Sequence, residues 1–128
     1  MIELSKVKEG EKVADLGSGD GRIAIAFAKS GALVDGFELD EERIKESREL
    51  IKIERLDKKI KIHNKNFWDV DLSPYDITVI YPMPDVMQEL EEKLSKELKM
   101  GTRILLNYYP FPSLKCKALK NKVYLYIR

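Results

Sequence analysis

The stretch "VADLGSGDGRIAI", residues 13–25, places three glycines at alternate positions between an apolar segment and an alanine-rich one. The apolar residues before Gly17 predict a short buried strand, and the residues after Gly21 predict a helix that ends at Gly31. Glycines in such a strand-to-helix turn permit unusual backbone dihedral angles and a close approach of the backbone to a ligand. Because the first N–H groups of a helix have no partner within it, this turn predicts a binding site for an anionic group.

Strands and helices continue to alternate along the rest of the chain. Apolar segments predict strands over residues 12–16, 32–39, 59–64, 75–81 and 102–109. Segments with apolar residues at helical spacing predict helices over residues 21–31, 40–56 and 84–101. Asp40 is the expected N-cap of the second helix. The tail, residues 114–128, predicts two strands around a polar turn at residues 120–122.

This alternation predicts an α/β fold with a doubly wound, mostly parallel sheet that ends in a C-terminal antiparallel hairpin. The sequence has no linker, repeat or low-complexity segment, so residues 1–128 are expected to form a single domain. Sheets of this kind bind ligands beyond the carboxyl ends of their strands, where the direction of the chain reverses. The glycine turn follows the first predicted strand and lies at such a point.

The composition is that of a soluble globular chain, with 35% charged residues, 44% hydrophobic residues and a formal net charge of +1. Because Lys and Arg are spread along the chain, we expect no stable nucleic-acid partner. No apolar segment approaches the roughly 20 residues that cross a bilayer, and the N-terminus lacks the apolar core of a signal peptide. The one cysteine, Cys116, cannot form an internal disulfide and is expected to pack as a small residue. We therefore expect a cytoplasmic protein without a membrane segment.

Two classes of ligand compete for the glycine turn. A dinucleotide site has the pattern G-x-G-x-x-G, whereas residues 15–21 read D-x-G-x-G-x-G. The third small residue of the dinucleotide pattern would fall on Arg22, which is too long for close packing of helix and strand. Asp20 would also bring negative charge near a pyrophosphate. S-adenosylmethionine fits better, because its carboxylate can bind backbone N–H groups and its ammonium can bind a nearby carboxylate or carbonyl.

Glu38 is a second feature that points to a nucleoside. It ends the second predicted strand, about 20 residues beyond the glycines, where an acidic side chain can accept hydrogen bonds from both ribose hydroxyls. This spacing is shared by the two classes of ligand. It therefore supports a ribose without choosing between them.

The segment "VADLGSGDGRIAIAFAKSGALVDGFELD", residues 13–40, resembles the first two motifs of class I S-adenosylmethionine-dependent methyltransferases. Three further segments resemble small archaeal protein-lysine methyltransferases and the mitochondrial family that methylates lysine on the c subunit of ATP synthase and on the adenine nucleotide carrier. They are "NKNFWDVDL", "IYPMPDVMQELEEKLSKELKMGTRILLNYYPFP" and "KVYLYIR". The resemblance implies a Rossmann-like methyltransferase sheet, S-adenosylmethionine as cofactor and a lysine-presenting protein as substrate. A methyltransferase for a small molecule or an RNA base, or a non-catalytic S-adenosylmethionine-binding module, are the alternatives.

The resemblance also assigns the cofactor-binding residues. Four residues would surround the methionine part of the cofactor: Asp15, Gly17, Ser18 and Gly19. Glu38 would hold the ribose. Asn66 and Phe67 would contact adenine, since an amide can pair with the edge of the base and an aromatic ring can cover its face. In the alternative interpretation these residues form a polar loop from which Phe67 and Trp68 pack into the core.

Tyr81, at the end of the fourth predicted strand, is the candidate catalytic residue. A lysine amine has a reference pKa of about 10.4 and must lose a proton before it attacks, which a desolvated position favours. The hydroxyl or the backbone carbonyl of Tyr81 could orient that amine. The segment "YPMP", residues 81–84, resembles only loosely the N-P-P-Y type motif of amino-group methyltransferases, because its first residue lacks a short polar side chain. In the alternative interpretation Tyr81 packs and the prolines begin the next helix.

The segment "NYYPFP", residues 107–112, follows the fifth predicted strand. Its aromatic rings and prolines form either a channel for a lysine side chain or a plug for the core. His63 is the only histidine, so no metal site is expected. Larger relatives carry an N-terminal segment that covers the cofactor, whereas this chain begins shortly before the glycine turn. We therefore expect an open site, covered by the protein substrate or by a second copy of the chain in a homodimer.

Overall fold

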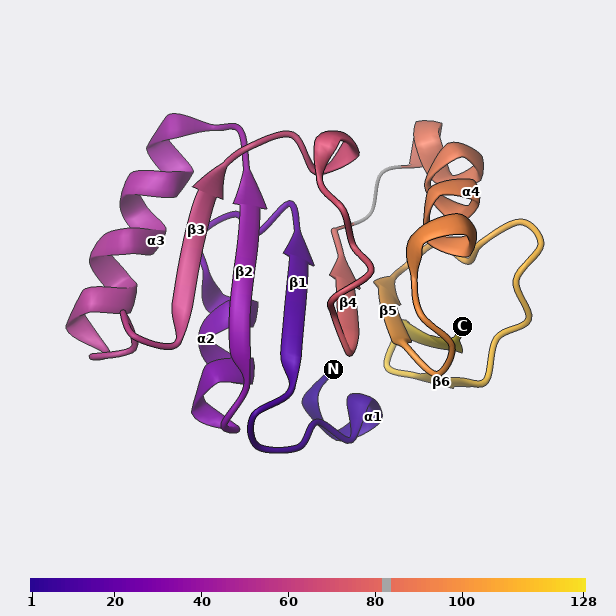
Figure 1. The fold of residues 1–128 in the computed structure, drawn as a ribbon, viewed down its shortest axis with the longest axis horizontal. Coiled ribbons are helices and arrows are strands. Elements are labelled where there is room, and N and C mark those ends of the chain that lie inside the picture. The colour runs from indigo at the N-terminus through magenta and orange to yellow at the C-terminus, as the bar shows by residue number, and fades with distance from the viewer. Residues whose placement is uncertain (82–83) are drawn as a thin grey trace.

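The computed structural model describes residues 1–81 and 84–128. Its strands are β1 (Lys12–Leu16), β2 (Leu33–Glu38), β3 (Ile60–Asn64), β4 (Ile77–Ile80), β5 (Arg103–Asn107), β6 (Ala118–Lys120) and β7 (Val123–Ile127). They form a seven-stranded sheet in the order β3-β2-β1-β4-β5-β7-β6 (Figure 1). Strands β1 to β5 pair in parallel, whereas β7 runs antiparallel to both β5 and β6. The prediction of a mostly parallel α/β sheet with a C-terminal antiparallel hairpin is confirmed.

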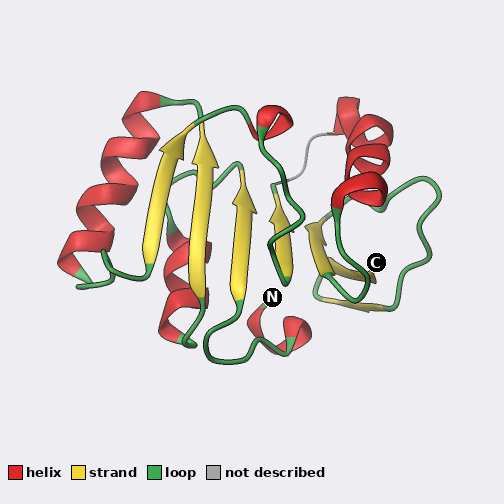
Figure 2. Ribbon diagram, viewed as in Figure 1, coloured by secondary structure: helices red, strands yellow, loops and turns green. Residues whose placement is uncertain are grey.

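Helices cover both faces of this sheet (Figure 2). The helices are α1 (Ile2–Ser5), α2 (Arg22–Lys29), α3 (Glu41–Ile53) and α4 (Met87–Glu97), with two 3-10 helices, η1 (Phe67–Asp69) and η2 (Pro84–Val86). Helices α2 and α3 contact β1, β2 and β3 on one face, and the apolar side of α4 packs on the other. Asp40 is the N-cap of α3, as predicted, because its carboxylate accepts a hydrogen bond from the N–H of Glu42 at 3.0 Å.

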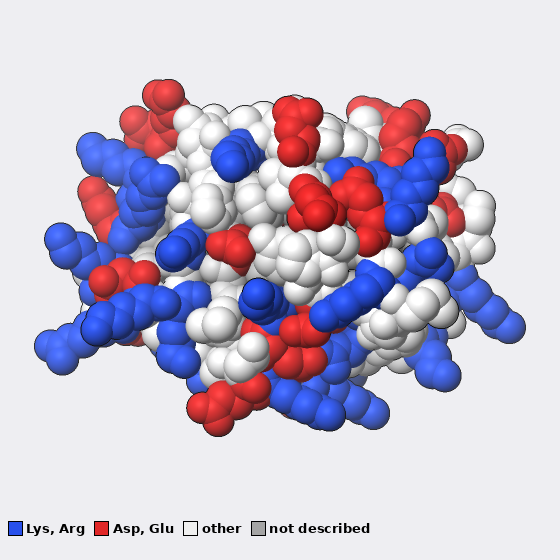
Figure 3. Space-filling model, in the orientation of Figure 1, with Lys and Arg blue, Asp and Glu red and all other residues white. Residues whose placement is uncertain are grey.

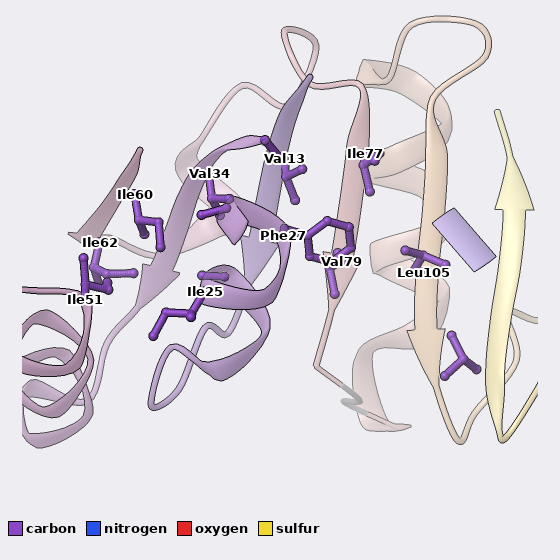
Figure 4. Close-up of a cluster of buried hydrophobic side chains, with 14 of the residues drawn as sticks. Val13, Ile25, Phe27, Val34, Ile51, Ile60, Ile62, Ile77, Val79 and Leu105 are labelled. Carbon is purple, nitrogen blue, oxygen red and sulfur yellow. The ribbon is translucent and has the colours of Figure 1, made fainter. Parts of the chain in front are cut away.

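Two apolar clusters, one on each face of the sheet, form the core. Successive side chains of a strand point to opposite faces, so Val13 belongs to the first cluster and Ala14 to the second. Figure 4 shows the first cluster, in which Ile25 and Phe27 of α2 pack against the strands. Full burial of one large apolar side chain contributes about 1.5–3 kcal/mol. A parallel sheet that is buried on both faces explains why the central strands read as continuous apolar runs.

The hairpin of β6 and β7 closes at the predicted polar turn. Asn121 and Lys122 have φ angles of 50° and 64°, and two consecutive left-handed residues are the signature of a turn that matches the twist of the strands.

The prediction that Cys116 packs as a small residue is wrong, because this residue is exposed. It lies in the segment that leads into the edge strand β6, where neither apolar cluster reaches it.

The centre of the sheet contains the point where the direction of the chain reverses. Strands β1 and β4 are neighbours, but the chain continues from β1 through α2 to β2 and from β4 through α4 to β5. A crevice is expected at the carboxyl ends of such strands. These ends lie at the top of Figure 1. The N–H of Tyr81 donates to the carbonyl of Leu16 at 3.0 Å, which holds the end of β4 against the end of β1.

Candidate active site

A pocket of about 430 Å³ opens at the carboxyl ends of β1, β2, β3 and β4. Six of the eight residues predicted from the sequence line it: Gly17, Gly19, Glu38, Asn66, Phe67 and Tyr81. Six further residues complete the lining: Phe37, Leu39, Asp40, Arg43, Lys65 and Trp68. Residues that are far apart in the sequence therefore meet at one edge of the sheet.

The glycine turn needs its glycines for two different reasons. Gly17 has a φ of 78°, and a Cβ placed on it would lie 3.1 Å from the Cβ of Tyr81. Gly21 is the N-cap of α2 with a φ of 89°, and a Cβ there would lie 3.0 Å from the Cβ of Ser47 on α3. Gly17 thus keeps the floor of the pocket open, whereas Gly21 permits close packing of two helices.

Glu38 joins the glycine turn to the end of β2. Its Oε1 accepts a hydrogen bond from the N–H of Gly19 at 2.8 Å. Its Oε2 accepts from the N–H groups of Leu39 and Asp40 at 3.0 and 3.1 Å. A carboxylate has about four lone-pair positions, so one remains for a donor that enters the pocket.

Asp15 and Ser18 lie beneath the turn and do not line the pocket. Both are buried, and the Oδ2 of Asp15 and the Oγ of Ser18 have no hydrogen-bond partner among the described residues. Burial and, to a smaller extent, the negative charge of Glu38 raise the pKa of Asp15 to about 7. Buried polar atoms are normally paired, so these two atoms are suited to a ligand that brings its own polar groups.

The wall opposite the glycine turn is the 3-10 helix η1. Asn66 is its N-cap, with its Oδ1 accepting from the N–H of Trp68 at 3.1 Å. The rings of Phe67 and Trp68 lie 4.9 Å apart between centroids. Because the side-chain oxygen of Asn66 is used within the loop, its NH₂ group is left to donate to a ligand. Both alternatives hold for these rings: Phe67 is buried in the second apolar cluster and Trp68 packs against it, and both also line the pocket.

The sequence carries only a partial signal for the pocket residues that were not predicted as part of the site. Arg43 lies three residues beyond the N-cap Asp40, so both face the same side of the first turn of α3. Lys65 directly precedes the predicted adenine contact Asn66 in the sequence. None of these neighbours carries a motif of its own, so only the folded arrangement identifies them as pocket residues.

Tyr81 and the aromatic segment after β5 form the more open part of the site. Tyr81 is 64% exposed at the pocket rim. Pro82 and Met83 of the predicted "YPMP" motif lie outside the described residues.

In the segment of residues 107–112, Phe111 is buried, and its N–H donates to the hydroxyl of Tyr126 at 2.9 Å. Tyr108 and Tyr109 are exposed, so the segment closes the core with one ring and presents two at the surface.

Among residues 1–81 and 84–128 there is no group of three or more His, Cys, Asp or Glu side chains that could hold a metal ion. His63 pairs with Asp35 at 2.9 Å, and the other oxygen of Asp35 accepts from the hydroxyl of Tyr75 at 2.9 Å.

None of the helices in the described part of the chain has the length and apolar character that crossing a bilayer requires.

The arrangement of the pocket fits a ligand with three different parts. The buried carboxyl of Asp15 beneath the glycine turn suits a cation. The predicted anion contact finds no free donor at Gly17, Ser18 or Gly19, because the first two N–H groups donate to the carbonyl of Phe37 and the third donates to Glu38. Glu38 suits a pair of hydroxyls, and the NH₂ group of Asn66 beside the ring of Phe67 suits a flat heterocycle. These are the parts of an amino acid joined to a nucleoside.

Comparison with known proteins gives one family. The model of the ANTKMT methyltransferase domain matches residues 15–118. A protein-lysine N-methyltransferase of Saccharolobus islandicus is 33% identical, over 99% of this chain and 85% of that protein. The human lysine N-methyltransferase named for the c subunit of ATP synthase is 36% identical over 88% of this chain and 48% of its own length. The chain thus spans about half the length of the ATP synthase relatives that it matches.

Solved structures agree with the fold. An RNA methyltransferase from Salinibacter ruber, in complex with S-adenosyl-L-homocysteine, is similar with a TM-score of 0.94 and 27% identity. The similarity covers 98% of this chain and 86% of that one. The fold is therefore that of a Rossmann-like methyltransferase domain.

Proposed function

Because the chain belongs to the ANTKMT methyltransferase domain family, we propose that it is an S-adenosylmethionine-dependent methyltransferase that modifies the side-chain amine of a protein lysine. The observation that carries the proposal is the pocket in which the glycine turn, Glu38 and Asn66 meet at the carboxyl edge of the sheet. Bound S-adenosylmethionine supplies a methyl group on a positively charged sulfur, and transfer of that group is an in-line displacement. The protein has to bind the cofactor, align the amine and exclude water.

Each part of the cofactor is assigned to a different set of pocket residues. The turn at Gly17 and Gly19 would lie against the methionine end, with the buried Asp15 Oδ2 and Ser18 Oγ as partners for its polar groups. The carboxylate of Glu38 accepts from the ribose. Asn66 donates to the edge of adenine, and Phe67 covers its face. An ammonium group near Asp15 would favour the ionised carboxylate and offset the cost of burying it.

Tyr81 is the candidate that orients the amine. It follows β4 at the rim of the pocket, beside the turn that holds the methionine end. An oxygen acceptor at this place would align the lone pair of a neutral lysine amine with the methyl group. The carbonyl and the hydroxyl of Tyr81 are both available for this role.

Several observations favour a protein over an RNA substrate. Two of the relatives named above are protein-lysine methyltransferases, although the Salinibacter structure is named an RNA methyltransferase. Nucleic-acid sites carry a basic patch. The described lining of this pocket balances two acidic residues, Glu38 and Asp40, against two basic ones, Arg43 and Lys65. On the face seen in Figure 3, positive and negative side chains are interspersed.

The proposal includes the cellular compartment of the protein and the partner that covers its site. The single cysteine supports a reducing compartment, the cytoplasm, as the place of action. The exposed position of Tyr81 supports a lysine-presenting protein, or a second copy of the chain in a homodimer, as the cover of the site.

Incubation of the purified protein with labelled S-adenosylmethionine and cell extract tests the proposal. We expect label in protein bands, with the modified lysine located by mass spectrometry. Label in RNA or in small metabolites would support the first alternative. Binding of S-adenosylhomocysteine without any transfer would support a non-catalytic module. Binding of a nicotinamide dinucleotide instead would overturn the choice of cofactor.

A further inference from the structure

A nearly buried lysine on α4 holds the adenine side of the pocket. The Nζ of Lys93 donates to the carbonyls of Trp68 and Val70 at 3.2 and 2.9 Å, and its side chain is only 11% exposed. It also pairs with the Oε2 of Glu97 at 2.6 Å, one helical turn later. The other oxygen of Glu97 accepts from the N–H of Leu72 at 3.1 Å. One ion pair on α4 therefore contacts the segment of residues 66–72 at three backbone groups.

This segment contains the wall of the pocket. Asn66, Phe67 and Trp68 all line it, and η1 begins at the side chain of Asn66. Lys93 binds carbonyls at the opposite end of the same short helix. A 3-10 helix of one turn has little stability of its own, because it makes few internal hydrogen bonds. The rings of Phe67 and Trp68 pack against the second apolar cluster, and the side chains at the two ends of η1 hold the backbone that carries them.

A buried ammonium is costly unless several acceptors surround it. Lys93 has three: two carbonyls and one carboxylate. An apolar side chain of similar length would fill the same space but would leave these acceptors without a donor. The carbonyls would then seek water, and the segment would move away from α4.

We propose that Lys93 is a positioning residue that fixes the adenine wall, so that α4 determines the affinity for the cofactor without touching it. The inference rests on the proposed function, because it assigns the wall to the base of S-adenosylmethionine. The amine would be aligned at Tyr81, on the opposite side of the pocket. Lys93 therefore acts on the binding of the cofactor and leaves the rate of transfer at saturation unchanged.

The test compares Lys93→Met with Lys99→Met. Lys99 provides a matched control, because it also pairs with one carboxylate, Asp76 at 2.7 Å, but its side chain is half exposed and outside the pocket lining. Trp68 is the only tryptophan, so its fluorescence reports on the wall directly. Quenching of Trp68 by acrylamide is measured without ligand, affinity for S-adenosylhomocysteine by calorimetry, and KM and kcat by methyl transfer. A thermal melt establishes that each variant is folded.

We expect Lys93→Met to make Trp68 more accessible to the quencher and to weaken cofactor binding and raise its KM about tenfold, with kcat within about twofold. Glu97→Gln should act in the same direction but less, since the amide keeps an oxygen for Leu72. Lys99→Met should match the parent in all three measurements.

Three results would overturn the inference, and they are distinguishable. If the parent binds S-adenosylhomocysteine and Lys93→Met binds it equally well, Lys93 has no positioning role although the proposed function stands. If the parent binds neither S-adenosylmethionine nor S-adenosylhomocysteine, the proposed function fails and the cofactor role of Lys93 fails with it. A folded Lys93→Met with unchanged quenching also contradicts the inference, whatever its affinity.

Discussion

The two halves of the carboxyl edge of the sheet are built differently. In the half formed by β1, β2 and β3, side chains tie the loops to one another: Glu38 accepts three backbone hydrogen bonds, and Asn66 caps η1. In the half formed by β4 and β5, Tyr81, Tyr108 and Tyr109 stand at the surface with 64%, 59% and 47% of their area exposed. The first half is preorganised, whereas the second is open.

Under the proposed function, this difference would separate the binding of the cofactor from the binding of the protein substrate. A preorganised site loses little conformational entropy when it binds, which suits a cofactor that enters in every catalytic cycle. Exposed tyrosines offer apolar area with a polar tip, which suits a partner that arrives from solution. Substitutions in the first half are therefore expected to change cofactor affinity, and substitutions in the second half to change methyl transfer.

The largest effect is expected at the glycine turn. Gly17→Ala would place a Cβ 3.1 Å from the Cβ of Tyr81 and narrow the floor of the pocket. We expect affinity for S-adenosylhomocysteine to fall about a hundredfold, measured by calorimetry. Gly10→Ala is the matched control, because Gly10 has a similar φ of 83° but no described atom within 4 Å of an added Cβ. Equal affinities of the two variants for S-adenosylhomocysteine would contradict a role of Gly17 in binding the cofactor.

A pH dependence of stability is expected from the buried carboxyl beneath the same turn. The pKa of Asp15 is raised to about 7, so the folded protein holds a proton that the unfolded chain releases near pH 4. Stability from this group is therefore lost as the pH rises through this range. Relative to Asp15→Asn, the parent should lose about 2.5 kcal/mol of unfolding free energy between pH 5 and pH 8.

Urea unfolding of both proteins at pH 5 and pH 8, without cofactor, measures this difference. The comparison with Asp15→Asn is needed because Asp20 and Asp76, whose pKa values are lowered, change stability in the opposite sense at lower pH. A difference between parent and variant that does not vary with pH would mean that Asp15 is ionised in the folded protein.

Glu38→Gln is expected to have a smaller effect on the same half. The amide keeps one acceptor oxygen, but its NH₂ group would face backbone N–H groups that now donate to the carboxylate. We expect affinity for S-adenosylhomocysteine to fall about thirtyfold. Asp76→Asn is the control, since Asp76 also accepts two hydrogen bonds, from the N–H of Lys12 and the Nζ of Lys99, but precedes β4 and is outside the pocket lining. Parent-like affinity of Glu38→Gln would show that its charge is not needed.

The smallest effect is expected in the open half. Tyr81→Phe should leave cofactor affinity unchanged and slow methyl transfer to protein about tenfold, because an acceptor for the amine is lost. Tyr124→Phe provides the control, on β7 and outside the pocket lining. Transfer at the parental rate would exclude a role for the hydroxyl of Tyr81 and leave its carbonyl as the orienting group. Loss of cofactor affinity would instead contradict the division into two halves.

Much of the fold was predictable because the signals are local. Apolar runs identified every strand from β1 to β5, and the glycine turn and Asp40 identified the starts of two helices. Element ends were less well predicted: the fourth strand was expected over residues 75–81 and covers Ile77–Ile80. Apolar residues beyond a strand end pack like those within it, so composition alone does not show where pairing stops. The short helices α1 and η1 were missed, since they have too few residues for a period.

By itself, the sequence determined the alternation of strands and helices, the glycine turn and the acidic residue at the end of β2, because each depends on neighbours along the chain. The tertiary structure alone placed Asp15 beneath the turn and brought Arg43 and Lys65 to the pocket. It also set Lys93 of α4 against carbonyls more than 20 residues away in the sequence. Burial and long-range hydrogen bonds arise only when distant segments pack together, so no local pattern can encode them.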